Sequence, residues 1–445
     1  MVLSRKLENI LSKSYRRVVA DKPRQIAFEV LTEVMRNGAY SNLLLPQKLA
    51  SSGMDQRDKA LTTELLYGSI RQIGRNDYLA GKFSSKPWSE VDSEIVDCVR
   101  LGAYQLFDMR IPTHAAVDST TNLARKVAGE SKATFVNAIM RKLSSKSLEE
   151  HLTEVQDDSI KSLSIRYSHP EWIINSYRDL IGDISELKSL LVANNTPTKP
   201  MLVAWPGKSR VEDFQGVQGE YSPYAIQIDR APFEVEQIRN REAGIQDEGS
   251  QLVAIAFAKA AENQNPWMDL CAGPGGKAAL LSYLAPDGFY ANEISQARAD
   301  LVRQVVKEGS KVLVGDGREI NLAVGAILAD VPCTGLGALR RRPEVRWRRS
   351  PNDLSNLTKL QFELAEHAIQ LLPKDGIFGY ATCSPHIAET RAQCAALEKK
   401  FQIEKIDVSS FLPKNLKEGV VNGYMQLWPH RHDTDAMFLA LYRKR

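Results

Sequence analysis

Two cysteines follow apolar segments of the chain in a pattern that suits nucleophilic chemistry. Cys333 ends the motif Asp330-Val331-Pro332-Cys333, and Cys383 lies within residues 380–385. Each motif follows an apolar run of strand length. Two cysteines at the ends of adjacent parallel strands, one of them beside an aspartate, predict a cleft that holds two thiols.

The spacing of the cysteines argues against two other classes of site. The chain has an odd number, five, with neither a disulfide framework nor a CxxC metal pair. No suitably placed set of histidines accompanies them, so zinc binding is disfavoured and we expect no metal site. From their surroundings alone, Cys98, Cys271 and Cys394 are interpreted as buried small apolar residues. This cysteine usage favours a reducing cytoplasm.

A glycine-rich segment predicts a turn that approaches a ligand closely. Residues 267–277 read Trp-Met-Asp-Leu-Cys-Ala-Gly-Pro-Gly-Gly-Lys, an apolar strand that runs into a turn and opens a helix. Glycines remove side chains from the turn, and the helix N-terminus favours a carboxylate or a phosphate. Ala278 stands where the strict dinucleotide fingerprint has glycine. A P-loop would need glycine at position 271 and Ser or Thr at position 278, so a phosphate-cradling loop is the weaker interpretation.

Two acidic residues further along the chain predict contacts with a nucleoside. Glu293 ends the next apolar strand, where a carboxylate can accept hydrogen bonds from ribose hydroxyls. Asp316, between Gly315 and Gly317, suits a contact with adenine. An acidic residue at a strand end can equally be a helix cap or a solvated loop charge, and for Asp316 both interpretations stay open.

An arginine-rich segment follows Cys333. Residues 339–349 contain six arginines and one glutamate around Trp347. Such a segment suits a loop that grips phosphates, with the aromatic ring as a stacking platform. The alternative is a solvated charged surface. The candidate phosphate-binding residues are Arg340, Arg341, Arg342, Arg346, Arg348 and Arg349.

The order of elements from residue 246 onward predicts how these motifs meet. Apolar strands alternate with helical stretches such as residues 296–308 and 353–372, and residues 437–442 add a late strand. This alternation predicts a doubly wound parallel sheet. Such a sheet binds ligands beyond the carboxyl ends of its strands. The polar residues that would lie there are Asp269, Glu293, Asp316, Asp330 and Cys383.

Two further regions precede this sheet. From residue 24 to about residue 145, apolar residues recur at helical spacing, as at Ile26, Val30 and Val34, so we expect an all-α domain over residues 1–145. Residues 146–245 contain six prolines between short segments such as residues 201–205, and they predict a small mixed α/β connector. The sheet-containing domain would span residues 246–445.

The composition is that of an ordinary globular protein, with 43% hydrophobic and 25% charged residues. A net charge of +4 over 445 residues does not by itself argue for a polyanionic partner. Residues 1–24 carry seven Lys/Arg against two acidic residues but no apolar run, so they do not predict a secretory signal. Apolar runs elsewhere are far shorter than the roughly 20 residues that cross a bilayer. We expect a soluble cytoplasmic protein.

Together these motifs resemble the bacterial small-subunit (16S) rRNA cytosine-C5 methyltransferases of the Sun/Fmu (RsmB) type, in the Nol/Nop/Sun family. Residues 246–250, 269–277, 330–333 and 381–384 carry the resemblance, which spans nearly the whole chain. That family's helical front domain is similar to the antitermination factor NusB, and residues 114–117 lie where this similarity is clearest. The chain departs from the family at residues 386–390, where Pro-Glu-Glu-Asn is common, and at residues 436–438, where the family has Gly-Phe-Phe.

The resemblance implies an all-α NusB-like RNA-binding domain, a small α/β connector and a Rossmann-like class I methyltransferase domain. It also implies methyl transfer from S-adenosyl-L-methionine to C5 of a cytosine in small-subunit ribosomal RNA, with no membrane or metal partner. Cys383 would add to C6 as a thiolate. Asp330 would hydrogen-bond or protonate the N3/N4 edge, and Cys333, or a water that it positions, would take the C5 proton. The implied cofactor pocket comprises Cys271, Ala272, Gly273, Pro274, Gly275, Gly276, Lys277, Glu293, Asp316 and Asp330, and the six arginines become RNA contacts.

Two rival interpretations stay open from the sequence. The first is a non-catalytic RNA-binding or ribosome-assembly factor on the same fold, against which the intact Cys383, Cys333 and Asp330 argue. The second is a nicotinamide-dependent oxidoreductase, which the imperfect glycine fingerprint and the paired thiols disfavour. A binding titration with S-adenosylmethionine against NAD separates the two kinds of enzyme.

Overall fold

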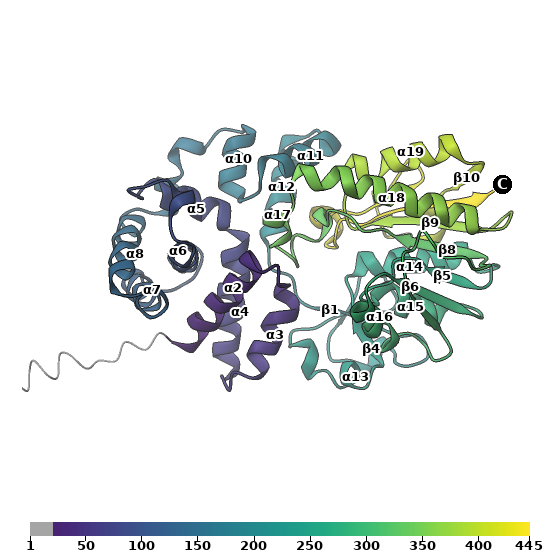
Figure 1. Cartoon of the computed structure of the whole chain (residues 1–445), viewed down its shortest axis with the longest axis horizontal. Helices are drawn as coiled ribbons and strands as arrows, with labels where there is room; N and C mark the ends of the chain where they lie inside the picture. Colours follow the sequence, from purple (N-terminus) through teal and green to yellow (C-terminus); the bar gives the residue numbers. More distant parts are fainter. Residues whose placement is uncertain (1–20) are drawn as a thin grey trace, which may run out of the picture. The chain divides into compact units, whose positions relative to one another are not determined.

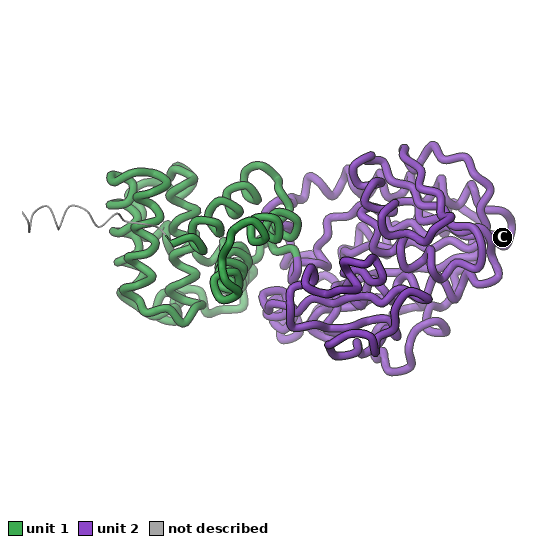
Figure 2. The backbone as a smooth tube through the Cα atoms, turned by 90° about the horizontal axis from the view of Figure 1, so that it is seen from below, with its two compact units in different colours: residues 1–171, 342–344 green, residues 172–341, 345–445 purple. Residues whose placement is uncertain are grey.

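The fold is described from a computed structural model, which covers residues 21–445. The chain forms two compact units (Figure 2). One contains the described residues up to Glu171 together with Arg342–Glu344, and the other contains Trp172–Arg341 and Val345–Arg445. All but the last four residues of the basic stretch 1–24 lie outside the described part.

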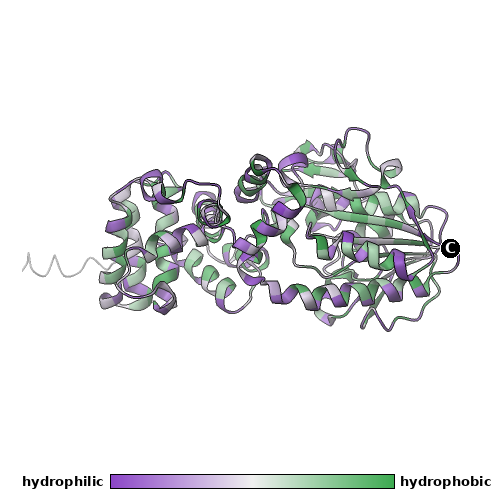
Figure 3. Ribbon diagram, turned by 90° about the horizontal axis from the view of Figure 1, so that it is seen from above, coloured by the Kyte–Doolittle hydropathy of each residue, from purple (hydrophilic) through white to green (hydrophobic). Residues whose placement is uncertain are grey.

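The regular structure described in the first unit is helical (Figure 1). Ile26, Val30 and Val34 are buried as their spacing predicts, and the helices show alternating hydrophobic and hydrophilic residues along their length (Figure 3). The α-helices are α2 (Lys22–Arg36), α3 (Ser41–Ala50), α4 (Gln56–Arg71), α5 (Ile73–Gly81), α6 (Ser93–Phe107), α7 (Thr113–Ala128), α8 (Glu130–Leu143), α9 (Leu148–His151) and α10 (Ile160–Tyr167).

This unit extends past the expected domain boundary at residue 145. α10 packs against α5, and the Ser168 hydroxyl accepts a hydrogen bond from the Gly74 N–H at 2.9 Å. Arg342–Glu344 also belong to this unit, where the buried Glu344 carboxylate accepts from the Ser41 hydroxyl at 3.0 Å. Contacts between residues far apart in sequence therefore extend the helical unit beyond the limit of its apolar periodicity.

The second unit begins with two helices and a small antiparallel sheet. The helices are α11 (Glu171–Ile181) and α12 (Ile184–Asn195). The sheet has the strand order β2-β3-β1-β4, formed by β1 (Met201–Ala204), β2 (Val217–Gln218), β3 (Ala225–Gln227) and β4 (Ala243–Ile245), with α13 (Glu236–Arg239) before β4. The region is mixed α/β as expected, but it belongs to the same compact unit as the large sheet that follows.

The large sheet confirms the predicted α/β architecture. Its strand order is β11-β12-β13-β9-β8-β5-β6-β7, with β10 paired to β13. Pairing from β9 to β7 is parallel, whereas β10 to β13 pair antiparallel. The strands are β5 (Trp267–Asp269), β6 (Phe289–Glu293), β7 (Lys311–Val314), β8 (Ala326–Asp330), β9 (Ile377–Thr382), β10 (Ile403–Ile406), β11 (Val420–Val421), β12 (Tyr424–Gln426) and β13 (Phe438–Lys444).

Helices cover both faces of this sheet (Figure 1). On β8, Ala326 and Leu328 join a core with α14 and α15, whereas Ile327 and Ala329 join a second core with α18 and α19. A strand that is buried on both faces reads as a continuous apolar run, which explains why β8 is apolar up to Asp330. The helices of this part are α14 (Glu248–Ala260), α15 (Gly276–Leu284), α16 (Gln296–Arg303), α17 (Val345–Arg348), α18 (Pro351–Leu371), α19 (Arg391–Lys400) and α20 (Pro429–His432). Among the described helices, none is both long enough and apolar enough to cross a membrane.

Candidate active site

The structure brings the predicted motifs to one edge of the large sheet. Asp269, Glu293 and Asp330 end the parallel strands β5, β6 and β8, and Cys383 directly follows β9. The order reverses at β5, because β6 and β7 lie on one side of it while β8 and β9 lie on the other. Such a switch point opens a ligand-binding crevice in doubly wound sheets.

The glycine-rich turn after β5 passes close to the end of β6. The Gly273 N–H donates to Glu293 Oε2 at 3.0 Å, and the Ser295 N–H donates to Oε1 at 3.0 Å. A Cβ on Gly273 would lie 2.1 Å from Glu293 Oε2 and would displace the carboxylate. Arg298 also pairs with Oε2 at 3.5 Å, so of the roughly four lone-pair directions of the carboxylate the clearest one left for a ligand is on Oε1.

Lys277 connects this turn to the end of β8. From the first turn of α15, its Nζ donates to Asp330 Oδ2 at 2.8 Å. Burial opposes the charge on Lys277, but the attraction of Asp330 outweighs it, so the pKa of Lys277 is raised. Burial also raises the pKa of Asp269 to about 7, with Asp330 adding to the effect. Lys277 is thus a buried cation that holds one oxygen of Asp330.

The two cysteines predicted to share a cleft lie in contact. Cys333 Sγ and Cys383 Sγ are 3.3 Å apart, and both residues are partly exposed. The hydrogen bond with Cys383 raises the pKa of Cys333, and burial raises it further, so Cys333 keeps its proton. Lys277 and Arg341 are close enough for their charges to interact with Cys383. Since a neighbouring cation favours a thiolate, the arrangement suits Cys383 as the nucleophile.

Gly337 holds the segment after Cys333 against the turn that contains Cys383, a role that the sequence did not reveal. Its N–H donates to the Cys383 carbonyl at 2.9 Å, and its carbonyl accepts from the Ala436 N–H at 2.9 Å. A Cβ on Gly337 would lie 2.3 Å from the Ala436 carbonyl oxygen and 2.7 Å from that of Cys383. Both are backbone atoms, so no side chain fits at this position.

Asp316 lies two residues beyond β7, and its carboxylate already has a partner. The Arg318 backbone N–H and guanidinium both donate to it, and the same guanidinium donates to Glu363 at 2.6 Å. These hydrogen bonds lower the pKa of Asp316 to about 2. A contact with adenine would therefore have to share this carboxylate with Arg318. Ile294, which the sequence analysis did not single out, is 68% exposed directly after Glu293 and offers an apolar surface there.

Two arginines of the arginine-rich segment, Arg340 and Arg346, are buried and hydrogen-bonded to other residues of the protein. Arg346 is fully buried, and its guanidinium donates to Asn195 Oδ1 at 2.7 Å and to the Asn194 carbonyl at 3.1 Å. Arg340 is 4% exposed and donates to the side chain and carbonyl of Asp433. The expectation that Arg340 and Arg346 bind phosphates is corrected, because their charged groups are buried on internal acceptors.

Arg341 also has internal partners. It pairs with both carboxylate oxygens of the buried Asp435. Burial and the charge of Asp435 raise the pKa of the neighbouring Asp247 to about 6. Arg341 is therefore better suited to electrostatic support of Cys383 than to binding a phosphate. The partly exposed arginines of the segment, Arg341 aside, are Arg342, Arg348 and Arg349.

The other three cysteines lack the surroundings of a reactive thiol. Burial raises the pKa of Cys98 and of Cys271, and it raises that of Cys394 to about 12. Cys98 and Cys394 are buried, while Cys271 is partly exposed in the glycine turn. Over residues 21–445, no group of three or more His, Cys, Asp or Glu side chains is arranged to hold a metal ion.

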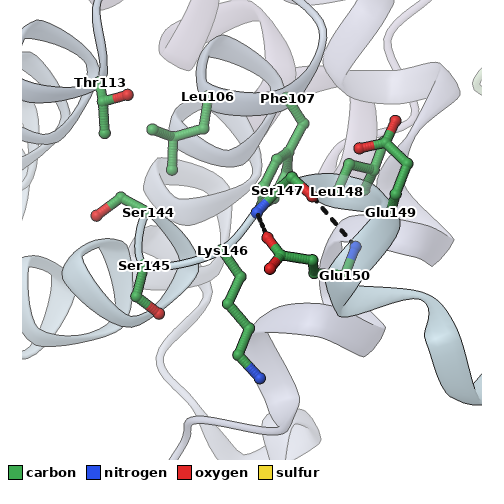
Figure 4. A pocket seen from close by; sticks show the side chains of 10 residues that line it. All are labelled: Leu106, Phe107, Thr113, Ser144, Ser145, Lys146, Ser147, Leu148, Glu149 and Glu150. Carbon is green, nitrogen blue, oxygen red and sulfur yellow. Dashed lines mark hydrogen bonds between the residues drawn. The ribbon is translucent and has the colours of Figure 1, made fainter.

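A hollow of about 500 Å³ in the helical unit contains none of the predicted site residues (Figure 4). Its wall includes Ser147 and Glu150, which cap α9 reciprocally: the Ser147 N–H donates to the Glu150 carboxylate, and the Glu150 N–H donates to the Ser147 hydroxyl. These polar groups are therefore used by the local fold.

Glu389 is the main residue near the thiols to which sequence reasoning gave no role. It is fully buried, and its carboxylate accepts hydrogen bonds from the residues that follow each cysteine, Thr334 and Ser384. The available signal was its position six residues after Cys383, inside the segment that departs from the common family pattern.

Two parts of the chain match known protein families. Residues 256–443 match the family described as 16S rRNA methyltransferase RsmB/F, and residues 21–145 match the NusB family. A protein of Mycobacterium tuberculosis that is named "Putative methyltransferase MT1451" is 39% identical over 97% of this chain and 99% of its own length. The crystal structure of PH0851 has a TM-score of 0.78 at 19% identity, covering 96% of this chain and 100% of that one. NSun6 from Pyrococcus horikoshii, solved with SFG, has a TM-score of 0.51 at 16% identity, covering 62% and 98%.

Proposed function

We propose, on the premise that this chain belongs to the family of 16S rRNA methyltransferases RsmB/F, that it transfers a methyl group from S-adenosyl-L-methionine to C5 of a cytosine in ribosomal RNA. The observation that carries the proposal is the pair of thiols 3.3 Å apart beyond the carboxyl ends of β8 and β9. One of them, Cys333, keeps its proton, and the other, Cys383, has two cations nearby.

The glycine turn and Glu293 fit the proposed methyl donor. Gly273 lets the backbone pass against the Glu293 carboxylate, which can still accept from ribose hydroxyls on Oε1 and, in competition with Arg298, on Oε2. The N-terminus of α15 suits the methionine carboxylate, and Ile294 offers a surface for the adenine. S-adenosylmethionine, of which SFG is an analogue, supplies an electrophilic methyl group when bound. Its assignment here rests on family membership and on this turn.

On the base side, Asp330 and Lys277 form a fixed polar pair. Lys277 holds Oδ2 of Asp330 at 2.8 Å, so the carboxylate is oriented before substrate binds. Its other oxygen would then accept from the cytosine N4 amino group or stabilise protonation at the N3/N4 edge as charge develops. This pairing helps to activate C6 for attack.

Cys383 and Cys333 would carry out the covalent steps. The Cys383 thiolate forms a bond to C6, and the ring electrons shift toward C5, which then takes the methyl group. The C5 proton leaves next, and the C5–C6 double bond re-forms as the bond between C6 and Cys383 Sγ breaks. A water that Cys333 positions would accept that proton and pass it to solvent, because the raised pKa of Cys333 keeps the Cys333 thiol itself protonated.

The helical unit would contribute RNA affinity. Residues 21–145 match the NusB family. Within the charged segment, we propose as contacts to RNA phosphates Arg342, which belongs to the helical unit, and Arg348 and Arg349, which belong to the second unit. Ribosomal RNA is the substrate class that the family description names, and it supports our proposal of a cytoplasmic enzyme.

The proposal is tested with the full chain, S-adenosylmethionine and 16S rRNA, offered both as naked RNA and as a partly assembled small-subunit particle. Mass mapping of the RNA should find 5-methylcytosine at a defined site after incubation. Cofactor and RNA binding without any methyl transfer to either substrate would instead support the non-catalytic assembly factor. A methyl group on a base or position other than cytosine C5 would contradict the proposed chemistry.

A further inference from the structure

A single buried carboxylate connects the two cysteine turns. Glu389 Oε1 accepts from the Thr334 N–H at 2.7 Å and from Gln361 Nε2 at 3.0 Å. Its Oε2 accepts from the Thr334 hydroxyl and from the Ser384 hydroxyl, each at 2.5 Å. The Tyr380 hydroxyl donates to the Glu389 carbonyl at 2.8 Å, which fixes the backbone that carries the carboxylate.

These partners lie next to the two thiols. Thr334 directly follows Cys333, and Ser384 directly follows Cys383. Gln361, from α18, also donates to the carbonyl of Pro332 at 2.8 Å, on the other side of Cys333. The carboxylate therefore binds the backbone and side chains of both turns at once, across 55 residues of sequence in the case of Thr334.

The burial of the Glu389 carboxylate indicates that its hydrogen bonds to the two turns matter. Glu389 is 0% exposed, and an ionised group is costly to bury unless hydrogen bonds satisfy it. All four groups around the two oxygens are donors, which suits a carboxylate because it accepts but does not donate. A neutral amide in the same place would present an N–H group to donors and leave part of the set unsatisfied.

We propose that Glu389 is a positioning residue, whose carboxylate holds the Cys333 turn and the Cys383 turn at a fixed spacing. The inference rests on the proposed function for the roles of the two thiols. Its geometric part concerns the protein alone.

The charge of Glu389 acts in the same direction as its hydrogen bonds. The hydrogen bond with Cys383 and burial are the larger causes of the raised pKa of Cys333, and the negative charge of Glu389 adds to them. The charges of Cys383 and Asp330 act on Cys333 in the same direction. Removal of the Glu389 charge should therefore make Cys333 easier to deprotonate, while the loosened turns separate the thiols.

The test uses the full-length protein with Glu389→Gln, Glu389→Asp and Ser384→Ala. A matched control is Glu248→Gln, since Glu248 is also buried and accepts two backbone N–H groups, from Tyr221 and Ser222, at 2.6 and 2.7 Å. Circular dichroism and thermal melts establish folding. Alkylation by iodoacetamide, followed at Cys333 and Cys383 by peptide mass spectrometry over a pH series, reads the thiols without RNA or cofactor.

In the parent protein, Cys383 should be alkylated before Cys333. Glu389→Gln should raise the Cys333 rate several-fold and lower its pH midpoint, since the thiolate is the reacting form. Its kcat for methyl transfer should fall about 100-fold with KM for S-adenosylmethionine unchanged. In Glu389→Asp, the pH midpoint of Cys333 alkylation should return part of the way to the parent value, because the charge is kept. Turnover should stay low, because the shorter side chain cannot reach both turns. Ser384→Ala, which removes one donor, should have a smaller effect of the same sign.

Glu248→Gln should leave the ratio of the two alkylation rates unchanged. A folded Glu389→Gln protein with the parent ratio and pH midpoint would overturn the inference, whether or not the protein methylates RNA. Conversely, altered thiol reactivity in Glu389→Gln together with a parent protein that methylates no RNA would support the positioning role and contradict the proposed function.

Discussion

Replacement of Glu293 by Ala should weaken the binding of S-adenosylmethionine by a calculable amount. The N–H groups of Gly273 and Ser295 each donate to one oxygen of its carboxylate, and Arg298 pairs with Oε2 at 3.5 Å. Ribose hydroxyls would donate to the remaining direction on Oε1 and share Oε2 with Arg298. Loss of a charged acceptor for these donors should cost about 1.5–3 kcal/mol of binding free energy. That corresponds to a Kd about 10- to 150-fold higher.

Isothermal titration calorimetry with S-adenosylmethionine measures this change directly. Glu293→Gln is the conservative companion and should show a smaller loss, because its amide keeps one acceptor oxygen. Asp300→Ala is the control, since Asp300 lies on the neighbouring α16, is 54% exposed and pairs with Arg303; its Kd should equal that of the parent. An unchanged Kd in folded Glu293→Ala would show that Glu293 does not bind the cofactor and would refute its role as an acceptor for the ribose hydroxyls.

Three further predictions follow from burial and packing. Arg346→Gln should lower the free energy of unfolding, measured by urea denaturation, by about 3 kcal/mol. Arg349→Gln should leave this stability unchanged. It should instead reduce the slope of log RNA affinity against log salt by about 0.7, if one single-strand phosphate contact is lost. The opposite assignment of effects would show that the division of the arginine segment into internal and RNA-facing residues is wrong. Gly337→Ala should destabilise the fold by about 1–3 kcal/mol and slow methyl transfer, and parent-like melting and activity would contradict the close backbone approach. Burial raises the pKa of Asp269 from 3.8 to about 7, so between pH 4 and 7 Asp269 is ionised in the unfolded chain but still protonated in the folded protein, and the parent loses stability as pH rises. Asp269→Asn lacks this loss, so its unfolding free energy should increase relative to that of the parent from pH 4 to 7 and stay higher by a constant amount above pH 7. Parallel curves of unfolding free energy against pH would disprove the shift.

The sequence predicted the sheet and the edge where the site lies because both depend on local patterns. Strands buried on both faces are apolar along their whole length, so Asp269, Glu293 and Asp330 marked the ends of β5, β6 and β8 correctly. Parallel connections then bring these ends to the same edge of the sheet. The contact between Cys333 and Cys383 follows from the same topology, since β8 and β9 are neighbours.

Features that depend on distant partners were beyond reach of these patterns. Arg346 looks like its neighbours in sequence, but its acceptor Asn195 lies 151 residues away, so its burial has no local signal. The same is true of Glu389, whose role arises from Thr334. The compact helical unit is longer than the apolar repeat for a related reason, because α10 joins it through packing against α5.

The central claim, that Cys383 adds to the base and Cys333 assists its release, is tested most directly by trapping protein on RNA. The two variants are Cys383→Ala and Cys333→Ala, each incubated with S-adenosylmethionine and 16S rRNA and then separated under denaturing conditions. Cys333→Ala should accumulate a slowly migrating covalent complex on methylated RNA, because addition and methyl transfer proceed while elimination stalls. Cys383→Ala should form no complex, although it should still bind the cofactor. A covalent complex in Cys383→Ala with none in Cys333→Ala would reverse the two roles and contradict the account.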